Sequence, residues 1–227
     1  RDKEFKVDLT TGLRVIALVS VISSAVLIVL SYPVARVFVG EYPSTAALGN
    51  VIAAFMIGLL PFSFVYMMQR AFFALEDTRT PFIFTSIQIA IHITGSITAG
   101  FLAPKEILVV TIALVTAFSI SVQGIIAYAM LKKRIGTLSG FGVSRSLAKF
   151  VLSAVPATAS GIGTLWLIGG IGADSFAVDT VLSAVLSCIL VATPMALVYL
   201  ITLALLKSPE LGEIFAGLKG RFGQAKK

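Results

Sequence analysis

Three polar side chains in two long apolar stretches are the residues of this sequence best placed to do chemistry. Gln88 and His92 are four residues apart in one stretch, so a helix would place them on the same face. Gln123 reaches a similar depth in the next stretch, provided that this stretch runs the other way. Amides and a neutral imidazole can exchange hydrogen bonds, hold a polar ligand or report pH.

Two interpretations of these polar groups are open. In the first, Gln88 and Gln123 hydrogen-bond across a helix interface and His92 bonds a neighbouring hydroxyl, each bond contributing about 0.6–2 kcal/mol. In the second, the groups line a polar cavity, with Ser96 and Ser119 extending the stripe. The first is favoured because uncharged polar residues commonly join helices in membranes.

The remaining composition argues against an enzyme. The chain has one histidine and one cysteine, and its long apolar stretches contain no Asp or Glu beyond their first two residues. Metal sites, catalytic dyads and nucleophile–base pairs need side chains that these stretches lack. The glycine-containing loops also lack the Lys-Ser/Thr ending of a phosphate-binding loop. We therefore predict a protein that is not an enzyme and has no cofactor or metal.

The elements that must position these residues are transmembrane helices. Hydrophobic residues make up 57% of the 227 residues and charged residues 13%, with a mean hydropathy of +0.99. Each apolar stretch is near or above the roughly 20 residues that cross a bilayer. We predict an all-α integral membrane protein with six spans, near residues 13–39, 46–73, 81–102, 107–131, 147–168 and 178–206.

Basic residues predict the orientation of these spans. Of the 18 Lys and Arg, only Arg36 and Lys105 fall on the connections of one side, and all others lie on the opposite side. Short cytoplasmic loops hold the excess of Lys and Arg, so both termini are expected in the cytoplasm. The charge of +7 sits at the ends of apolar segments, which favours anionic lipid headgroups over nucleic acid as the partner.

The longest connection suggests how the chain is divided. Residues 132–146 contain three glycines between two apolar stretches. We expect a four-helix part at 1–134, a cytoplasmic linker at 135–146 and a terminal hairpin at 147–207. Residues 208–227 are expected to form a basic tail with an amphipathic helix on the cytoplasmic leaflet. Small residues that recur at four-residue spacing predict that helices approach each other closely. They are Gly95/Ala99, Ser96/Gly100 and Ser153/Ala157/Gly161.

A charged turn between the second and third stretches is the most specific motif. Thr80 precedes Pro81, so its hydroxyl is expected to cap a new helix that begins at the proline. Glu76 and Asp77 lie between Arg70 and Arg79, which predicts an ion-paired turn. An exposed turn of this kind would contribute little to stability.

The sequence of this turn resembles a known family. Gln69-Arg70-Ala-Phe-Phe-Ala-Leu-Glu-Asp-Thr-Arg-Thr-Pro81 is similar to the corresponding turn of the MurJ (MviN) family of the MOP exporter superfamily. These flippases move lipid II, the lipid-linked peptidoglycan precursor, across the bacterial inner membrane. Gly12-Leu13-Arg14 and Lys132-Lys133-Arg134 also look similar to the family's pattern.

The resemblance implies a place within a larger transporter. Family members have fourteen helices, and this chain would supply the last four of the second lobe plus the extra pair, which is thought to form a groove for the lipid tail. The family's main arginine cluster lies on preceding helices, and its proposed sodium site needs a carboxylate that 81–102 lacks.

The expected function is therefore the C-terminal part of a lipid II flippase that works by alternating access, with cell-wall synthesis proteins as further partners. The substrate-binding candidates are Gln69, Arg70, Arg79, Gln88, His92 and Gln123. Two alternatives remain open: another exporter of the superfamily, for a polysaccharide-lipid or drugs, or a membrane scaffold that transports nothing.

Overall fold

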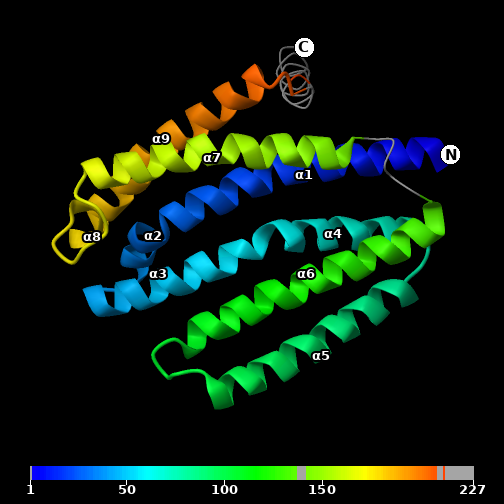
Figure 1. The fold of residues 1–227 in the computed structure, drawn as a ribbon, viewed down its shortest axis with the longest axis horizontal. Coiled ribbons are helices and arrows are strands. Elements are labelled where there is room, and N and C mark those ends of the chain that lie inside the picture. The colour runs from blue at the N-terminus through cyan, green and yellow to red at the C-terminus, as the bar shows by residue number, and fades with distance from the viewer. Residues whose placement is uncertain (1, 137–141, 209–211, 213–227) are drawn as a thin grey trace, which may run out of the picture.

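The computed structural model describes residues 2–136, 142–208 and 212, and its elements within these ranges are α-helices (Figure 1). In chain order they are α1 Asp2–Val29, α2 Ser31–Phe38, α3 Tyr42–Ile57, α4 Leu59–Ala74, α5 Arg79–Leu102, α6 Leu108–Ile135, α7 Val143–Leu167, α8 Phe176–Asp179 and α9 Val181–Leu205.

The helices confirm an all-α integral membrane fold. Five of them (α1, α5, α6, α7 and α9) are long and apolar enough to cross a bilayer, and the bent pair α3–α4 makes a sixth candidate. The orientation stays a prediction. The amphipathic tail helix falls almost wholly on residues 209–211 and 213–227, outside the described ranges.

The stretch 13–39 is predicted as one span that starts near Leu13 and is kinked at Pro33. Instead α1 begins at Asp2, because the polar first turns extend the same helix toward the N-terminus, and it ends at Val29. The chain then restarts as α2, whose third residue is Pro33. Proline is tolerated in a first turn but not in a helix interior, so the break lies just before it.

Pro61 lies within the apolar stretch 46–73 and so predicts a kink there. The structure has a break at Gly58, where the axis bends by 44° between α3 and α4. Pro61 has no N–H, so the helical hydrogen bond to the Ile57 carbonyl is lost. Ser24 Oγ of α1 donates to the neighbouring Met56 carbonyl at 2.5 Å. A Cβ at Gly58 would lie 3.1 Å from Ala117 Cα of α6, so glycine also permits this close approach.

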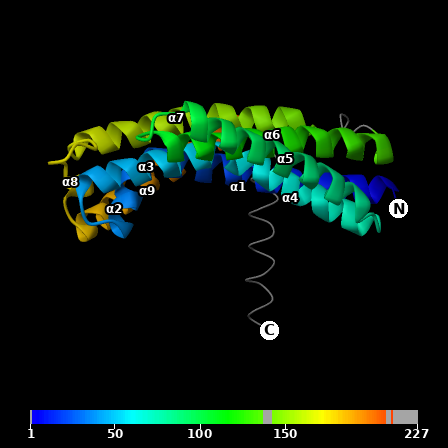
Figure 2. The ribbon, with the colours of Figure 1, turned by 90° about the horizontal axis from the view of Figure 1, so that it is seen from below.

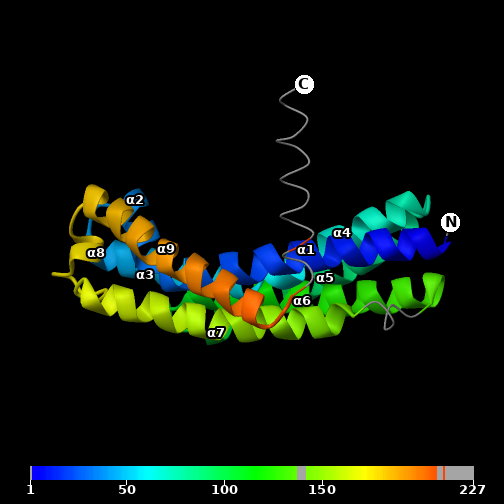
Figure 3. The same ribbon diagram turned by 90° about the horizontal axis from the view of Figure 1, so that it is seen from above.

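The helices form a curved slab. In Figures 2 and 3, α6 and α7 lie along one side of the slab and α1 and α4 along the other. α5 packs mainly on α6 at one edge, whereas α7 packs on both α1 and α9. The pair α7–α9 is therefore attached to the rest of the molecule mainly through α1 and α2.

Small residues bring α7 and α9 together, as predicted for Ser153, Ala157 and Gly161, which are all buried. Met195 of α9 covers Gly161, and a Cβ there would lie 2.3 Å from the Met195 sulfur. Tyr199 of α9 is also buried, and its hydroxyl donates to the Leu18 carbonyl of α1 at 3.0 Å.

The small residues of α5 behave less uniformly. Gly95 meets Val115 of α6, and Ala99 is buried on the same face. Gly100, however, is exposed, and a Cβ there would meet no atom within 4 Å. The prediction that Gly100 takes part in close helix approach was therefore wrong, because the residue points away from the α5–α6 interface.

Candidate functional site

A ladder of polar contacts joins α5 to α6. The helices run antiparallel, and polar residues recur every three or four positions on each, so they meet in register. The rungs are Gln123 Nε2 to Thr85 Oγ1 at 3.1 Å, Gln88 Nε2 to Ser119 Oγ at 3.1 Å, and Thr116 Oγ1 with His92 Nδ1 at 3.5 Å.

This geometry matches the first of the two interpretations of the polar set. Each glutamine pairs with a hydroxyl of the facing helix rather than with the other glutamine. Gln123 and Ser119 are buried, whereas Gln88 and His92 are half-buried. Their role in substrate binding stays a prediction.

Asp77 caps α5, so the prediction that Thr80 would cap it was wrong. Asp77 Oδ1 accepts from the backbone N–H of Arg79 at 3.1 Å and of Thr80 at 3.0 Å. Its Oδ2 accepts from the Thr80 hydroxyl at 2.7 Å. The helix begins two residues before Pro81, so Thr80 lies inside the first turn and a carboxylate before that turn takes its free donors.

The same contacts lower the pKa of the Asp77 carboxyl below its usual range. The largest cause is the backbone hydrogen bond from Thr80, followed by the bond from the Thr80 hydroxyl. Partial burial opposes the shift, and the N–H of Arg79 and the charge of Arg134 add to it. Hydrogen bonds to the ionised form always favour that form.

The predicted ion-paired turn does not form among the described residues of this corner. Arg70 stacks on Tyr66 instead, with its guanidinium carbon 4.6 Å from the ring centre, and it donates to the Tyr66 hydroxyl at 2.6 Å. Arg79 and Glu76 are exposed, where a pair of opposite charges gains little over water.

The predicted site residues therefore form two groups. Gln69, Arg70 and Arg79 lie where α4 ends and α5 begins, at the predicted cytoplasmic surface. Gln88, His92 and Gln123 lie within the α5–α6 interface. Among the described residues, none of the hollows reported below is lined by any of the six.

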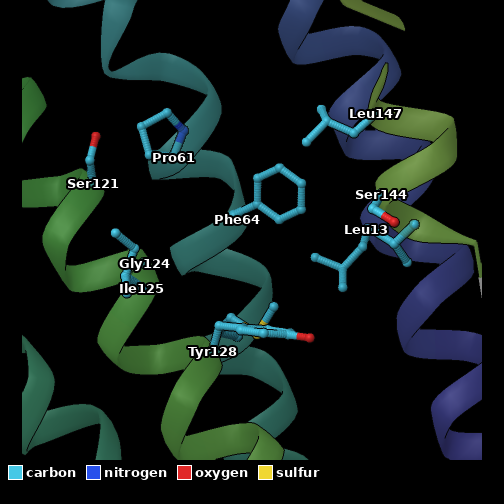
Figure 4. Close-up of a pocket in the computed structure, with 11 residues that line it drawn as sticks. Leu13, Pro61, Phe64, Ser121, Gly124, Ile125, Tyr128, Ser144 and Leu147 are labelled. Atoms are coloured by element: carbon cyan, nitrogen blue, oxygen red, sulfur yellow. The ribbon is translucent and has the colours of Figure 1, made fainter. Parts of the chain in front are cut away.

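A hollow lies between α6 and α7 (Figure 4). The resemblance implied a groove at the terminal pair, but the sequence did not indicate which residues would line it. Its volume is about 570 Å³. Leu13 of α1, Pro61 and Phe64 of α4, Ile125 of α6 and Leu147 of α7 are among its apolar lining residues. Only Ser121, Tyr128 and Ser144 contribute hydroxyl groups to the lining.

Two further hollows lie farther along α7, although neither shares a lining residue with the first. Leu60 and Val151 line the next, of about 280 Å³. Ile28 and Thr158 line both it and a third, of about 470 Å³, which reaches Trp166. We call the three together the α7 groove. It follows α7 from Val143 to Trp166, about 35 Å of helix, which is close to the thickness of a bilayer core.

No local signal in the sequence marks the α7 groove. Its residues are ordinary apolar positions of helices that are distant in the chain, and only their assembly leaves the space between them.

Comparison with known proteins decides the family. The family described as "Lipid II flippase MurJ" has a model that matches residues 1–186. The chain belongs to the MurJ family. A relative from Rhizobium meliloti (strain 1021), named "Probable lipid II flippase MurJ", is 35% identical over 80 residues. That alignment covers 34% of this chain and 15% of the relative, so the chain aligns with only a small part of that protein. The resemblance first seen in the charged turn is confirmed.

Proposed function

We propose that this MurJ-family chain is the C-terminal part of a lipid II flippase of the bacterial inner membrane. The observation that carries the proposal, beyond the family itself, is the α7 groove. A lipid-linked substrate has a long apolar tail that must remain in an apolar environment while its polar head crosses the bilayer. A groove of bilayer length gives the tail such a place.

The lining of the groove suits a polyprenyl chain better than a polar ligand. Its walls are mainly Ile, Leu, Val, Phe and Ala side chains of α1, α3, α4, α6 and α7. Such walls bind through dispersion contacts and exclude charged groups. The pyrophosphate head must therefore bind elsewhere, and Arg70 and Arg79 at the predicted cytoplasmic mouth are this chain's candidates for that contact.

The rest of the proposal concerns how the parts work together. Alternating access requires lobes that rock around a central cavity. We keep Gln88, His92 and Gln123, beside their contacts in the α5–α6 interface, as candidates for the wall of that cavity, and Gln69 as a candidate at the cytoplasmic mouth with Arg70 and Arg79. Anionic lipids and cell-wall synthesis proteins are the proposed partners of the intact flippase. Another exporter or a membrane scaffold is not favoured, since the family match names a lipid II flippase.

The first test is made in cells. Depletion of the intact protein should decrease lipid II labelled on the outer face of the inner membrane and increase the inner pool, and the intact gene should restore both. Unchanged outward lipid II, in a strain without a second flippase, would refute the proposal.

The α7 groove has its own test in the same complementation assay. Thr158→Trp fills a residue shared by two of the hollows, so it should reduce outward lipid II. Val155→Trp, on an exposed part of the same helix and outside the lining, is the matched control. Equal transport by the two variants at equal expression would exclude the groove as the tail site.

The proposed contact of Arg70 and Arg79 with the pyrophosphate is tested by the double variant Arg70→Gln, Arg79→Gln. This double variant should weaken binding of lipid II, whereas Lys105→Gln, which lies at the opposite end of α5, should not. Normal binding and growth of the double variant would remove both arginines from the site.

A further inference from the structure

A small hollow lies where α5 begins and α6 ends, away from the α7 groove. Its volume is about 280 Å³. Its lining residues are Phe72 of α4, Asp77 of the turn before α5, Thr80 of α5, and Met130, Lys133 and Arg134 of α6. The three hollows of the α7 groove have no charged residue in their linings, whereas this one has three. We call it the corner hollow.

The corner hollow lies at the depth of lipid headgroups. α6 begins at Leu108, just after the charged residues Lys105 and Glu106, which mark the opposite membrane surface. Lys133 is 25 residues beyond Leu108, so about 38 Å of helix separates the two. The hydrocarbon core of a bilayer is about 30 Å thick, or about 40–45 Å with the polar headgroups. Lys133 is therefore placed beyond the hydrocarbon, in the layer that holds the phospholipid phosphates.

Two cations of the corner hollow are available to a ligand. The side chains of Lys133 and Arg134 are exposed, and neither makes a hydrogen bond or an ion pair with the described residues. Asp77 is the acidic residue of the lining, and its lowered pKa keeps it ionised at neutral pH. The charge of Arg134 is the smallest cause of that shift. The lining therefore has one more positive charge than negative, which the single negative charge of a phosphodiester balances.

Asp77 binds its own turn rather than the cations. Its Oδ1 accepts from two backbone N–H groups of the first turn of α5, and its Oδ2 accepts from the Thr80 hydroxyl. Hydrogen bonds to an ionised carboxylate are stronger than neutral ones, so these bonds hold Asp77 at the cap. Because the donors of that turn are already occupied, the binding groups for an anion are the two cations of α6.

We propose that the corner hollow binds the phosphodiester group of an anionic membrane phospholipid. The Lys133 ammonium and the Arg134 guanidinium donate to the phosphate oxygens. Met130 and Phe72 give the same space an apolar side, against which the glycerol and the first acyl carbons pack. That apolar side favours a lipid over a free phosphate ion. The site deepens the proposed partnership with anionic lipids and rests on that part of the proposed function, but not on transport of lipid II.

The first experiment measures lipid affinity. The full chain in nonionic detergent micelles is titrated with dioleoylphosphatidylglycerol or with dioleoylphosphatidylcholine, and native mass spectrometry gives the dissociation constant of the first bound lipid. Both lipids have a phosphodiester, but the choline cation of the second would lie beside Lys133 and Arg134. Phosphatidylglycerol should therefore bind about tenfold more tightly. Equal affinity for the two lipids would overturn the proposal.

Matched charge variants locate the bound lipid. Lys133→Gln and Lys132→Gln each remove one exposed cation from the last turn of α6, but only Lys133 lines the hollow. Lys133→Gln should weaken binding of phosphatidylglycerol about fivefold, and Arg134→Gln by at least as much. Lys132→Gln should have little effect. Equal weakening by Lys132→Gln and Lys133→Gln would indicate general attraction to a basic surface and would overturn the hollow as the site.

Two further titrations test the chemistry of the ligand. Asparagine caps a helix as well as aspartate does, so Asp77→Asn removes the negative charge and should strengthen phosphatidylglycerol binding severalfold. Weaker binding would mean that the carboxylate contacts a cationic headgroup, which contradicts an anionic ligand. Inorganic phosphate at the concentration of the lipid should not displace it; displacement would assign the hollow to a free phosphate ion. A failed lipid II test would leave all these dissociation constants unchanged.

Discussion

The helix pairs α5–α6 and α7–α9 are held together by different kinds of contact. α7 and α9 each bury seven residues, whereas α5, of similar length, buries three. Small residues bring α7 and α9 into close contact, and Met195 covers Gly161. α5 is joined to α6 mainly by its polar ladder, with one close contact between Gly95 and Val115. Lipid is as apolar as leucine, so a helix pair in a membrane needs either close packing or hydrogen bonds.

The difference separates a rigid part from an adjustable one. Close packing tolerates little displacement, because interiors are dense and dispersion contacts fall off within an ångström. Hydrogen bonds between side chains can break and re-form with other partners. We therefore expect α7–α9 to move as one body and α5 to shift on α6.

The largest expected effect comes from filling the α7–α9 contact. Gly161→Leu forces Met195 out of its position, so it should lower the free energy of unfolding by about 3 kcal/mol. Gly163→Leu, on the open side of the same helix, should have little effect. The single cysteine, Cys188, packs against the hydrophobic cluster that contains Met195, so its reactivity with a thiol dye on heating measures the loss of stability. If Cys188 became reactive at the same midpoint temperature in both variants, this would contradict close packing between Gly161 and Met195.

Tyr199→Phe should lower the free energy of unfolding by a smaller amount. It removes the hydroxyl that links α9 to the Leu18 carbonyl but keeps the buried ring, so we expect about 1 kcal/mol. Tyr128→Phe alters an exposed tyrosine and is the control in the same Cys188 assay. A Tyr199→Phe midpoint identical to that of the control would mean that this bond adds no stability.

Removing one rung of the polar ladder should have a smaller and more local effect. Gln123→Leu breaks the bond to Thr85, worth about 0.6 kcal/mol, so amides of α5 should exchange with deuterium about threefold faster. Amides of α7 and α9 should keep their rates. Equal acceleration in both helix pairs would refute the proposed separation of a rigid and an adjustable part.

The smallest effect is the pH dependence of the cap on α5. The pKa of Asp77 is lowered in the folded state, so its stabilising contribution is complete at neutral pH and is lost as the pH falls through that lowered value. The amide proton of Thr80 should follow this loss in an NMR titration, and Asp77→Asn should abolish the response. A Thr80 signal that titrates equally in the variant would assign the effect to another group.

Local chemistry explains what the sequence could predict. The six spans follow from apolar length, and the polar face of α5 follows from the spacing of Gln88 and His92. The cap was misplaced by three residues because Thr80 and Asp77 both suit such a position. Arg70 stacks on the ring of Tyr66 rather than pairing with a carboxylate, since an exposed ion pair is only slightly more stable than the two charges in water. The α7 groove depends on how distant helices assemble, which no local pattern contains.

The break at Gly58 is also a point about which α4 can rotate as a rigid rod. The 16-residue α4 is about 24 Å long, so a change of about 10° in the 44° bend would displace its far end by about 4 Å. That end carries Gln69, Arg70 and the turn into α5. A rotation too small to disturb the packing around Ala117 would thus be enough to move a guanidinium by more than the width of a methylene group.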